Sequence, residues 1–250
     1  MQFKVAVVTP YYKETAAILK KCHDSVLGQT YPCDHIVVSD GHKNEFFEHK
    51  GRALHVTLPR AHGDNGNTPR GIGSMLADTY GYDVVAYLDA DNWFAPEHIA
   101  NAVAAHQASG HPVVCCKRTF HDMEGAPLPI IEPAEESRSH VDTSCFVIFR
   151  PAFSAFRAWS MPKELGPICD RILLHRILRD RFPIHWLEDR TVAFRTQYAY
   201  HYRLAGLPIP SGSKNNEDIA LSIGYLMTKE NINTIFDRLG YYPDFDVWAE

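Results

Sequence analysis

Two aspartates, Asp89 and Asp91, follow a run of apolar residues in the segment YLDADNW. Two carboxylates this close together at the end of a buried strand repel each other unless a cation lies beside them. Mg²⁺ and Mn²⁺ take oxygen ligands of this kind and commonly share them with the phosphates of a substrate. The alternative interpretation is a polar strand exit followed by a helix cap, because short acidic pairs also occur by chance.

Two other apolar runs end in polar corners of the same kind. VAVVTPYYKE leads from a buried run into Thr9, Pro10 and two tyrosines, and HIVVSDG ends in Asp40 and a glycine. Such a corner is either an ordinary strand exit or the floor of a ligand site. One tyrosine of the Tyr11–Tyr12 pair is expected to pack beneath the first helix.

The apolar periodicity of the first half alternates between strands and helices. We expect strands at residues 3–9, 35–41, 53–59, 83–93 and 112–118, with helices at 15–28, 68–80 and 95–110. This alternation predicts an α/β fold with a single Rossmann-like, mostly parallel sheet flanked by helices. Ligands bind such sheets at the carboxyl ends of the strands, where all three polar corners would lie.

The second half is less regular. It predicts a hairpin or a loop at 120–131, a strand at 141–149 and helices at 168–181 and 216–230. Residues 191–216 are aromatic and then rich in glycine, proline and serine, which predicts a flexible loop that could close over a ligand. No linker divides the chain, so we expect one domain over residues 1–250, with residues 1–120 and 121–250 as two functional halves.

Composition narrows the functional classes. With 250 residues, 45% of them hydrophobic, the chain can form a substantial core. Its net charge of −5 argues against a nucleic-acid partner bound by broad phosphate neutralisation. The N-terminus lacks the pattern of a signal peptide, no run is long enough to span a bilayer, and the six cysteines have no zinc-ligand spacing. We therefore expect a reduced, cytoplasmic protein.

Taken in order, the motifs of residues 3–120 resemble the family 2 glycosyltransferases of GT-A fold. VVTPYYKE is similar to that family's Pro-x-Tyr-Asn-Glu corner, with Lys13 in place of asparagine. SVLGQTYPCDHIVVSDG is similar to its helix and second strand, and VVAYLDADNWFAPEHI to its DxD stretch. NTPRGIGSMLA is similar to its Ala-Arg-Asn-x-Gly segment, with Gly71 in place of asparagine.

This resemblance implies roles for individual residues. Those that would line the nucleoside and diphosphate pocket are Pro10, Tyr12, Glu14, Asp40, Arg70 and Asp89. Asp91 would ligate Mn²⁺ or Mg²⁺, and Asp89 would contact the metal through water or contact the ribose. His201 is the candidate for a third metal ligand or a diphosphate contact, with an aromatic-cluster histidine as the alternative. The alternative interpretation of Arg70 is a solvated residue in a first helical turn.

In enzymes of this family, a carboxylate at the start of a helix, often within Glu-Asp, serves as general base. Asp170 in ICDRILLHRI holds that position, with Arg176 downstream, but Cys169 replaces the usual glutamate. Asp142 in VDTSC is the rival base. The helix after Asp170 is apolar and basic; it either faces the core or contacts a membrane surface that presents a lipid-linked acceptor.

The resemblance therefore implies a metal-dependent, inverting transferase that moves a sugar from a nucleotide-diphosphate sugar, a UDP-sugar first, to a hydroxyl of a saccharide or lipid-linked acceptor. Bacterial surface polysaccharide or glycoconjugate synthesis, in the cytoplasm or at the inner face of the membrane, is the setting it suggests. A non-catalytic sugar- or nucleotide-binding module is the alternative. A sugar nucleotidyltransferase ranks lower, because TPYYKETAA lacks the glycine-rich loop that holds a triphosphate.

Overall fold

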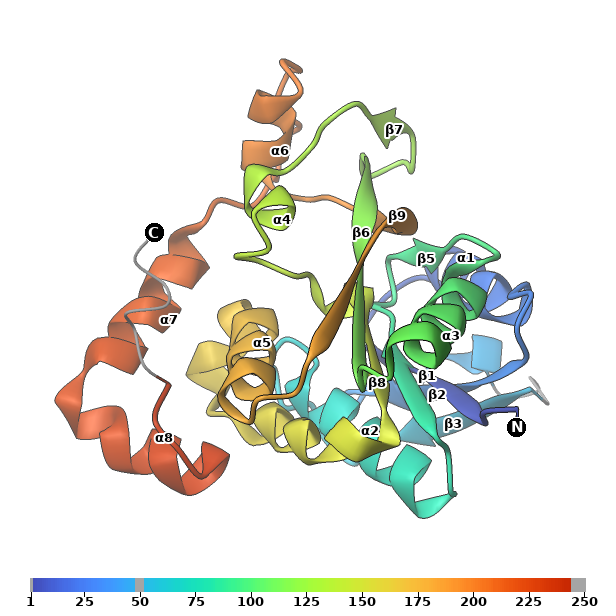
Figure 1. Ribbon diagram of the computed structural model, residues 1–250. Helices are drawn as coiled ribbons and strands as arrows, with labels where there is room; N and C mark the ends of the chain where they lie inside the picture. Colours follow the sequence, from blue (N-terminus) through green and yellow to red (C-terminus); the bar gives the residue numbers. More distant parts are fainter. Residues whose placement is uncertain (1, 48–51, 244–250) are drawn as a thin grey trace.

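The computed structural model describes residues 2–47 and 52–243. Its centre is a sheet in which eight strands follow the order β3-β2-β1-β4-β8-β6-β9-β5, while β7 pairs with β6 (Figure 1). The strands of the described residues are β1 (Val5–Tyr11), β2 (Cys33–Ser39), β3 (Ala53–Thr57), β4 (Val84–Tyr87), β5 (Trp93–Phe94), β6 (Val113–His121), β7 (Pro127–Leu128), β8 (Phe146–Phe149) and β9 (Ile184–Arg195).

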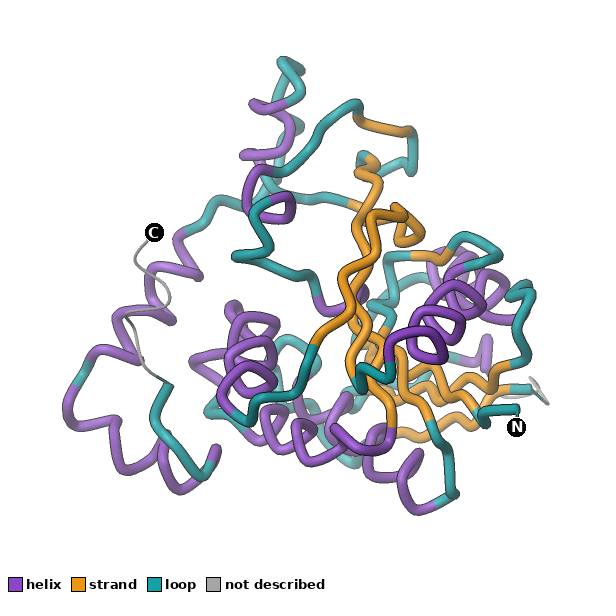
Figure 2. Tube along the Cα trace, viewed as in Figure 1, coloured by secondary structure: helices purple, strands orange, loops and turns teal. Residues whose placement is uncertain are grey.

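Helices lie on both sides of these strands (Figure 2). The α-helices are α1 (Ala16–Leu27), α2 (Asn67–Thr79), α3 (His98–Ser109), α4 (Pro133–Glu136), α5 (Cys169–Arg179), α6 (Ala199–Leu204), α7 (Glu217–Met227) and α8 (Ile232–Leu239). The 3₁₀ helices are η1 (Glu45–Phe47), η2 (Thr143–Cys145), η3 (Arg150–Ser160), η4 (Lys163–Ile168) and η5 (Lys229–Asn231).

Strands β3, β2, β1 and β4 run parallel to one another. β1 and β4 are buried along their whole length, as expected for apolar strands covered on both faces. Because the strands are parallel, β1, β2 and β4 end at the same edge of the sheet. This arrangement brings the three polar corners of the sequence together.

Alternate residues of β1 point to opposite faces and fix the two helices that follow it. The Thr9 hydroxyl lies 3.8 Å from the Cys22 thiol of α1. On the other face, Val8 packs so closely on α2 that a Cβ at Gly73 would lie 2.5 Å from its Cγ1. α1 therefore covers one face of the sheet and α2 the other.

In the second half, β8 lies antiparallel to both β4 and β6, and β6 runs parallel to β9. The predicted α/β fold, a mostly parallel sheet flanked by helices, is confirmed, with antiparallel strands added in this half. The core extends across both halves, from Val5 to Tyr241. α5 buries Ile172, Leu173 and Ile177, so the interpretation of this basic helix as core-facing is confirmed.

Three boundary predictions were wrong. The predicted strand 83–93 is divided into β4 and β5 by a turn in which Asn92 N–H donates to the Asp89 carbonyl at 2.9 Å. Only the last four residues of the predicted strand 141–149 are extended, since Asp142 caps a 3₁₀ turn before them. The predicted flexible loop 191–216 begins with the buried end of β9 and continues into α6.

Within the described residues, no helix is both long enough and apolar enough to cross a bilayer.

Candidate functional site

A cavity of about 400 Å³ lies at the carboxyl ends of β1, β2 and β4; we call it the edge cavity. Seven residues singled out from the sequence line it: Pro10, Tyr12, Glu14, Asp40, Arg70, Asp89 and Asp91. Asp64, Asn65, Gly66 and Lys214 complete much of its wall. The structure thus brings every predicted nucleotide-site residue to one cavity.

Arg70 is held by α2 and points at the acidic corner. Its side chain is buried, and Nη2 donates to Asp89 Oδ1 at 2.5 Å while Nη1 donates to the Asn65 carbonyl at 2.7 Å. Arg70 is therefore not a solvated residue in a first helical turn. It places a fixed positive charge beside the Asp89 carboxylate.

Asp91 is the carboxylate most suited to a cation. Its burial, together with the charges of Asp89 and Glu14, raises its pKa to about 7. A divalent cation would relieve this unfavourable burial of negative charge. Within residues 2–47 and 52–243, no three His, Cys, Asp or Glu side chains form a complete ligand set. The donor set fits a Mg²⁺ or Mn²⁺ site that is completed by phosphate oxygens and water.

The carboxylate of Asp40 is already committed to a loop. It accepts hydrogen bonds from His62 N–H at 2.9 Å, Gly63 N–H at 3.0 Å and His62 Nδ1 at 2.8 Å. A carboxylate has about four lone-pair positions, so little acceptor capacity remains. Asp40 thus borders the edge cavity and at the same time holds the backbone that forms the cavity's wall.

The two tyrosines of the first corner divide the roles as expected. Tyr11 is buried, and its hydroxyl pairs with His55 Nε2 at 2.8 Å and accepts from Asn44 N–H at 2.9 Å. Tyr12 is 41% exposed and meets the His42 ring edge-on. Tyr11 is the packing residue, and Tyr12 leaves a ring available to a ligand.

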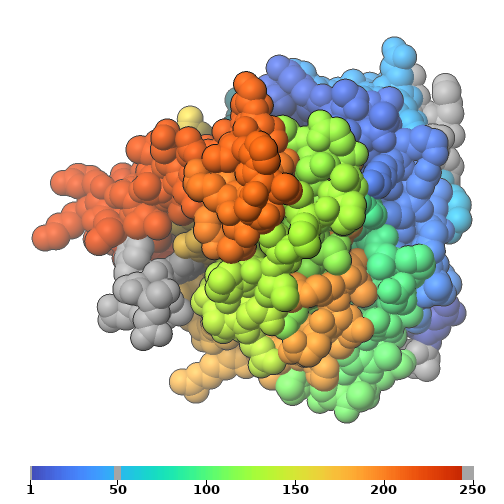
Figure 3. Space-filling model, turned by 90° about the horizontal axis from the view of Figure 1, so that it is seen from above, coloured from blue at the N-terminus to red at the C-terminus, as the bar shows by residue number. Residues whose placement is uncertain are grey.

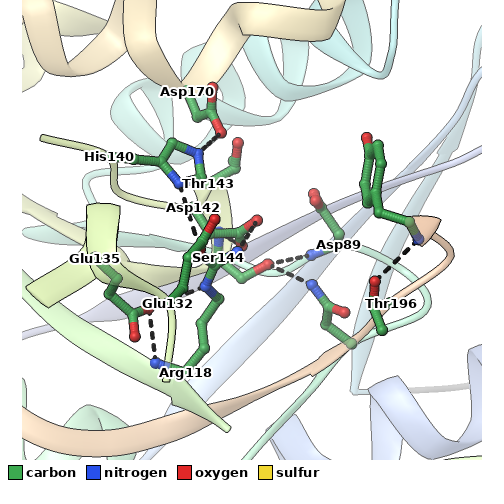
Figure 4. Close-up of polar contacts among 12 residues, drawn as sticks. Asp89, Arg118, Glu132, Glu135, His140, Asp142, Thr143, Ser144, Asp170 and Thr196 are labelled. Atoms are coloured by element: carbon green, nitrogen blue, oxygen red, sulfur yellow. Dashed lines mark hydrogen bonds and ion pairs between the residues drawn. The ribbon is translucent and has the colours of Figure 1, made fainter. Parts of the chain in front are cut away.

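A second cavity, of about 340 Å³, adjoins the first, and we call it the inner cavity. Asn65, Arg70 and Asp89 line both cavities. Asp142 and Asp170, the two candidate bases, line the inner cavity together with His201. In the view of Figure 4, Asp142 and Asp170 lie to the left of Asp89.

The two candidate bases are held differently. Asp142 Oδ1 accepts from Ser144 N–H at 2.9 Å, and its Oδ2 lies 3.4 Å from Arg118 Nη1. Burial raises the pKa of Asp142 to about 6 although Arg118 opposes this. Asp170 Oδ2 pairs with His140 Nε2 at 2.7 Å, and its Oδ1 accepts from Arg171 N–H at 2.7 Å.

The pKa of Asp170 is therefore shifted in the opposite direction from that of Asp142. Burial alone would raise the pKa of Asp170, but the charge and hydrogen bond of His140 outweigh burial and lower it. Asp170 stands in the first turn of α5, where the helix dipole also favours a negative charge. The contact with His140 and the position at the helix N-terminus therefore both favour the ionised form of Asp170.

Beneath these carboxylates lies an ion-pair network around the buried Arg118. Its guanidinium pairs with Glu132, with Glu135 at 2.9 Å and with Asp142 at 3.4 Å. A buried charge of this kind is stable only when it is fully paired. The network therefore fixes the floor of the inner cavity.

The structure does not bring His201 to Asp91, as a shared metal site would require. Its Nδ1 pairs with Thr196 Oγ1 at 2.6 Å, and its Nε2 lies 3.8 Å from Glu132 Oε1. Its ring also packs against Phe120 with centroids 4.8 Å apart. Nε2 thus faces Glu132 of the inner cavity and Nδ1 faces Thr196, and the ring lies among aromatic side chains, which corresponds to the aromatic-cluster alternative.

Seen from above, the orange segment of α6 lies against the green segment that contains β7 and α4 (Figure 3). Tyr202 of α6 packs there with Phe120, Leu128 and Ile130. After α6 the chain returns to the edge cavity, where Lys214 N–H donates to the Gln197 carbonyl at 2.7 Å. This return places a lysine on the wall of a cavity rich in carboxylates.

Among the residues of these cavities that sequence reasoning missed are Arg118, Glu132, His140 and Lys214. Arg118 and Glu132 look like ordinary surface charges in the sequence, because their pairing depends on the packing of separate segments. His140 was one histidine among fourteen. A signal for Lys214 did exist, since it lies within the glycine- and proline-rich stretch that was expected to close over a ligand.

Comparison with known proteins agrees with this geometry. Residues 6–169 match the family described as "Glycosyl transferase family 2". The succinoglycan biosynthesis protein ExoW of Rhizobium meliloti (strain 1021) is 32% identical over 108 residues, which are 40% of this chain and 33% of that protein. The chain thus matches about a third of the length of this curated relative.

Solved structures share the fold at low sequence identity. S. aureus TarS 1-349 in complex with UDP-GlcNAc has a TM-score of 0.61 at 15% identity, covering 94% of this chain and 70% of that one. A longer TarS structure has the same TM-score and covers 90% of this chain but only 40% of its own. The mannosyltransferase PcManGT from Pyrobaculum calidifontis, in complex with GDP-Man and Mn²⁺, has a TM-score of 0.57 at 14% identity, with 81% and 60% coverage.

Proposed function

The chain belongs to glycosyl transferase family 2, and from this we propose that it is a metal-dependent, inverting enzyme that transfers a sugar from a nucleoside-diphosphate sugar to an acceptor hydroxyl. One observation carries the proposal. The edge cavity, with its nucleotide-site residues, and the inner cavity, with its candidate bases, share Arg70 and Asp89. A sugar placed at this junction can meet a donor nucleotide on one side and an acceptor on the other.

In the edge cavity, the exposed ring of Tyr12 can stack on the nucleobase, and the backbone of Pro10 and of the Gly63–Gly66 loop shapes the pocket. Lys214 and the guanidinium of Arg70 provide positive charge for the diphosphate. Asp91, with Asp89, would hold Mn²⁺ or Mg²⁺. When bound, the cation supplies neutralisation of the charge that develops on the departing diphosphate.

In the inner cavity, we assign Asp170 as the general base. The acceptor oxygen forms a bond to the anomeric carbon as the bond from that carbon to the diphosphate oxygen breaks, and the electron pair leaves with the diphosphate. The acceptor proton passes to a carboxylate oxygen of Asp170. Attack from the side opposite the leaving group gives inversion. Holding the two substrates in line supplies much of the acceleration.

Asp142 remains the second candidate because its raised pKa of about 6 suits proton transfer near neutral pH. Asp170 is favoured because it stands at the start of a helix, as the base does in the family, and because its side chain is more exposed, at 17% against 11%.

A UDP-sugar is the donor we propose to test first, because the TarS structures hold UDP and UDP-GlcNAc. The match to ExoW supports an acceptor in bacterial polysaccharide synthesis. The single domain over residues 1–250, with donor-side and acceptor-side halves, is part of the same proposal.

The test is product formation from a panel of nucleotide sugars with Mn²⁺ and saccharide acceptors. Asp170→Asn should abolish transfer while donor binding persists, whereas Asp142→Asn should retain measurable turnover. Because the pKa of Asp170 is lowered, the acidic limb of the pH profile, measured with saturating metal and donor, should lie below the ordinary aspartate pKa of about 3.9. Wild-type turnover in D170N would show that Asp170 is not the base. An acidic limb of the pH profile near pH 6 that disappears in D142N would show that Asp142 is the base.

A further inference from the structure

His140 lies between two carboxylates on the wall of the inner cavity (Figure 4). Its Nε2 is 2.7 Å from Asp170 Oδ2, and its Nδ1 is 3.8 Å from Glu132 Oε2. The three residues come from separate segments: Glu132 directly precedes α4, His140 lies before η2, and Asp170 is in the first turn of α5. Nε2 is within hydrogen-bond distance of Asp170, whereas Nδ1 makes an ion-pair contact with Glu132 that is too long for a hydrogen bond. Two carboxylates on opposite sides of the ring favour its positively charged form. The geometry therefore favours the imidazolium.

The surrounding charges support the same protonation state. Burial lowers the pKa of His140 and the Arg118 charge does so too, but Asp170 and Glu132 outweigh both and raise it to about 9. The other ionisable groups that line this cavity with His140 come from several elements: Arg70, Asp89, Arg118, Glu132, Asp142, Cys169, Asp170, Arg171, Tyr198, Tyr200 and His201.

We propose that His140 is a positioning residue for sugar transfer, which clamps the Asp170 carboxylate to Glu132 and keeps it ionised toward the acceptor. This inference rests on the proposed function and adds to it a residue that acts through the base. With His140 and Arg171 N–H as its two donors, Asp170 retains lone pairs that can accept the acceptor proton.

The residue next to Asp170 explains why such a clamp is needed. Cys169 stands where the family pattern has a glutamate, and its thiol lies 3.9 Å from Arg70 Nη1 and 3.9 Å from Thr143 Oγ1. The Cys169 thiol is buried beside these two groups. Glu132, tied to the buried Arg118, supplies a fixed carboxylate from another segment, and His140 transmits this anchoring to Asp170.

The first test is kinetic and uses His140→Gln with His185→Gln as the control, since His185 is a partly buried histidine of β9 outside both cavities. We expect H140Q to lower kcat about tenfold or more while the donor KM stays within about twofold. The acidic limb of its pH profile should move up by about 1–3 units, because removing an adjacent positive charge raises the pKa of Asp170. H185Q should match wild type. Wild-type kcat and an unshifted limb in H140Q would overturn the proposal.

A second measurement does not depend on activity. In a histidine NMR titration of the folded protein, the His140 ring should titrate near pH 9 and should move toward the ordinary value of about 6.5 in D170N. A His140 that titrates near 6.5 in wild type would refute the clamp, even if H140Q fails to fold. A confirmed clamp in a protein that transfers no sugar from any donor would instead refute the proposed function, and with it the positioning role.

Discussion

Gly73→Ala tests how closely α2 must approach the sheet to place Arg70. A Cβ at Gly73 would lie 2.5 Å from Val8 Cγ1 and 3.4 Å from Val38 Cγ2. Val8 is β-branched and lies in β1, which is hydrogen-bonded on both sides, so it can neither rotate nor move freely. The helix must therefore move by several tenths of an ångström.

The expected magnitude combines two opposing effects. Overpacking a core costs about 1–3 kcal/mol, whereas alanine in a helix gains up to about 1 kcal/mol over glycine. The net destabilisation should be about 1–2 kcal/mol, which lowers Tm by about 2–8 °C for a chain of this size. Arg70 stands one turn before Gly73, so its hydrogen bond to Asp89 should loosen and donor affinity should fall by about tenfold or less.

Gly224→Ala is the matched control, because Gly224 is also helical but no atom lies within 4 Å of its Cβ position. It should raise Tm by about 1–4 °C and leave donor affinity unchanged. In a Val8→Ala background, the cost of G73A should shrink, since the clash partner is gone. Thermal melts and nucleotide titrations compare wild type, G73A, G224A, V8A and the V8A/G73A double variant. A G73A protein as stable as wild type, with unchanged affinity, would refute this account of α2.

Two further predictions concern the edge cavity. In EDTA, Asp91→Asn should stabilise the protein by a few kcal/mol, at most about 4, because the pKa of Asp91 rises from 3.8 to about 7 on folding and each unit is worth 1.36 kcal/mol. Because the pKa of Asp91 is higher in the folded state, its carboxylate destabilises the fold only where it is ionised: not below pH 3.8, increasingly up to pH 7, and by a constant amount above pH 7. Urea melts of D91N and wild type should therefore converge at low pH. Mn²⁺ should stabilise only the wild-type protein. Asp40→Asn should weaken the binding of UDP, CDP and GDP to the same extent and destabilise the fold by about 2 kcal/mol, because it loses charge-assisted hydrogen bonds to the His62–Gly63 loop. If calorimetry instead shows a changed preference between UDP and CDP, Asp40 contacts the nucleobase.

The edge cavity could be predicted from the sequence because its residues follow strands whose pattern is local. Each apolar run of the first half ends in a polar corner, and parallel strands must end at one edge. Pro10, Asp40 and Asp89, which are far apart in the sequence, therefore lie close together in the structure. Gly73 falls at the glycine of the Ala-Arg-Asn-x-Gly segment, and the close contact with Val8 gives a physical reason for a glycine there.

The inner cavity could not be predicted in the same way. Its charged residues belong to segments that meet only after β6, β8 and β9 have paired. The residues next to Arg118 and Glu132 in the sequence do not indicate that the two form a buried ion pair. β9 itself was missed because exposed charges at Glu188 and Asp189 interrupt it, and register shifts near Lys117 disturb its pairing with β6. Long-range pairing, rather than propensity, decides the structure there.

The most direct test of the central claim is a thermal melt with UDP, GDP, dTDP and CDP, each with Mn²⁺ or with EDTA. A ligand at a hundred times its Kd stabilises the folded state by about 2.7 kcal/mol, which is a shift of about 5–10 °C here. The account predicts such a shift with one nucleoside diphosphate, UDP first, in Mn²⁺ and its loss in EDTA and in D91N. No shift with any of the four nucleotides in Mn²⁺ would contradict a metal-dependent donor site in the edge cavity.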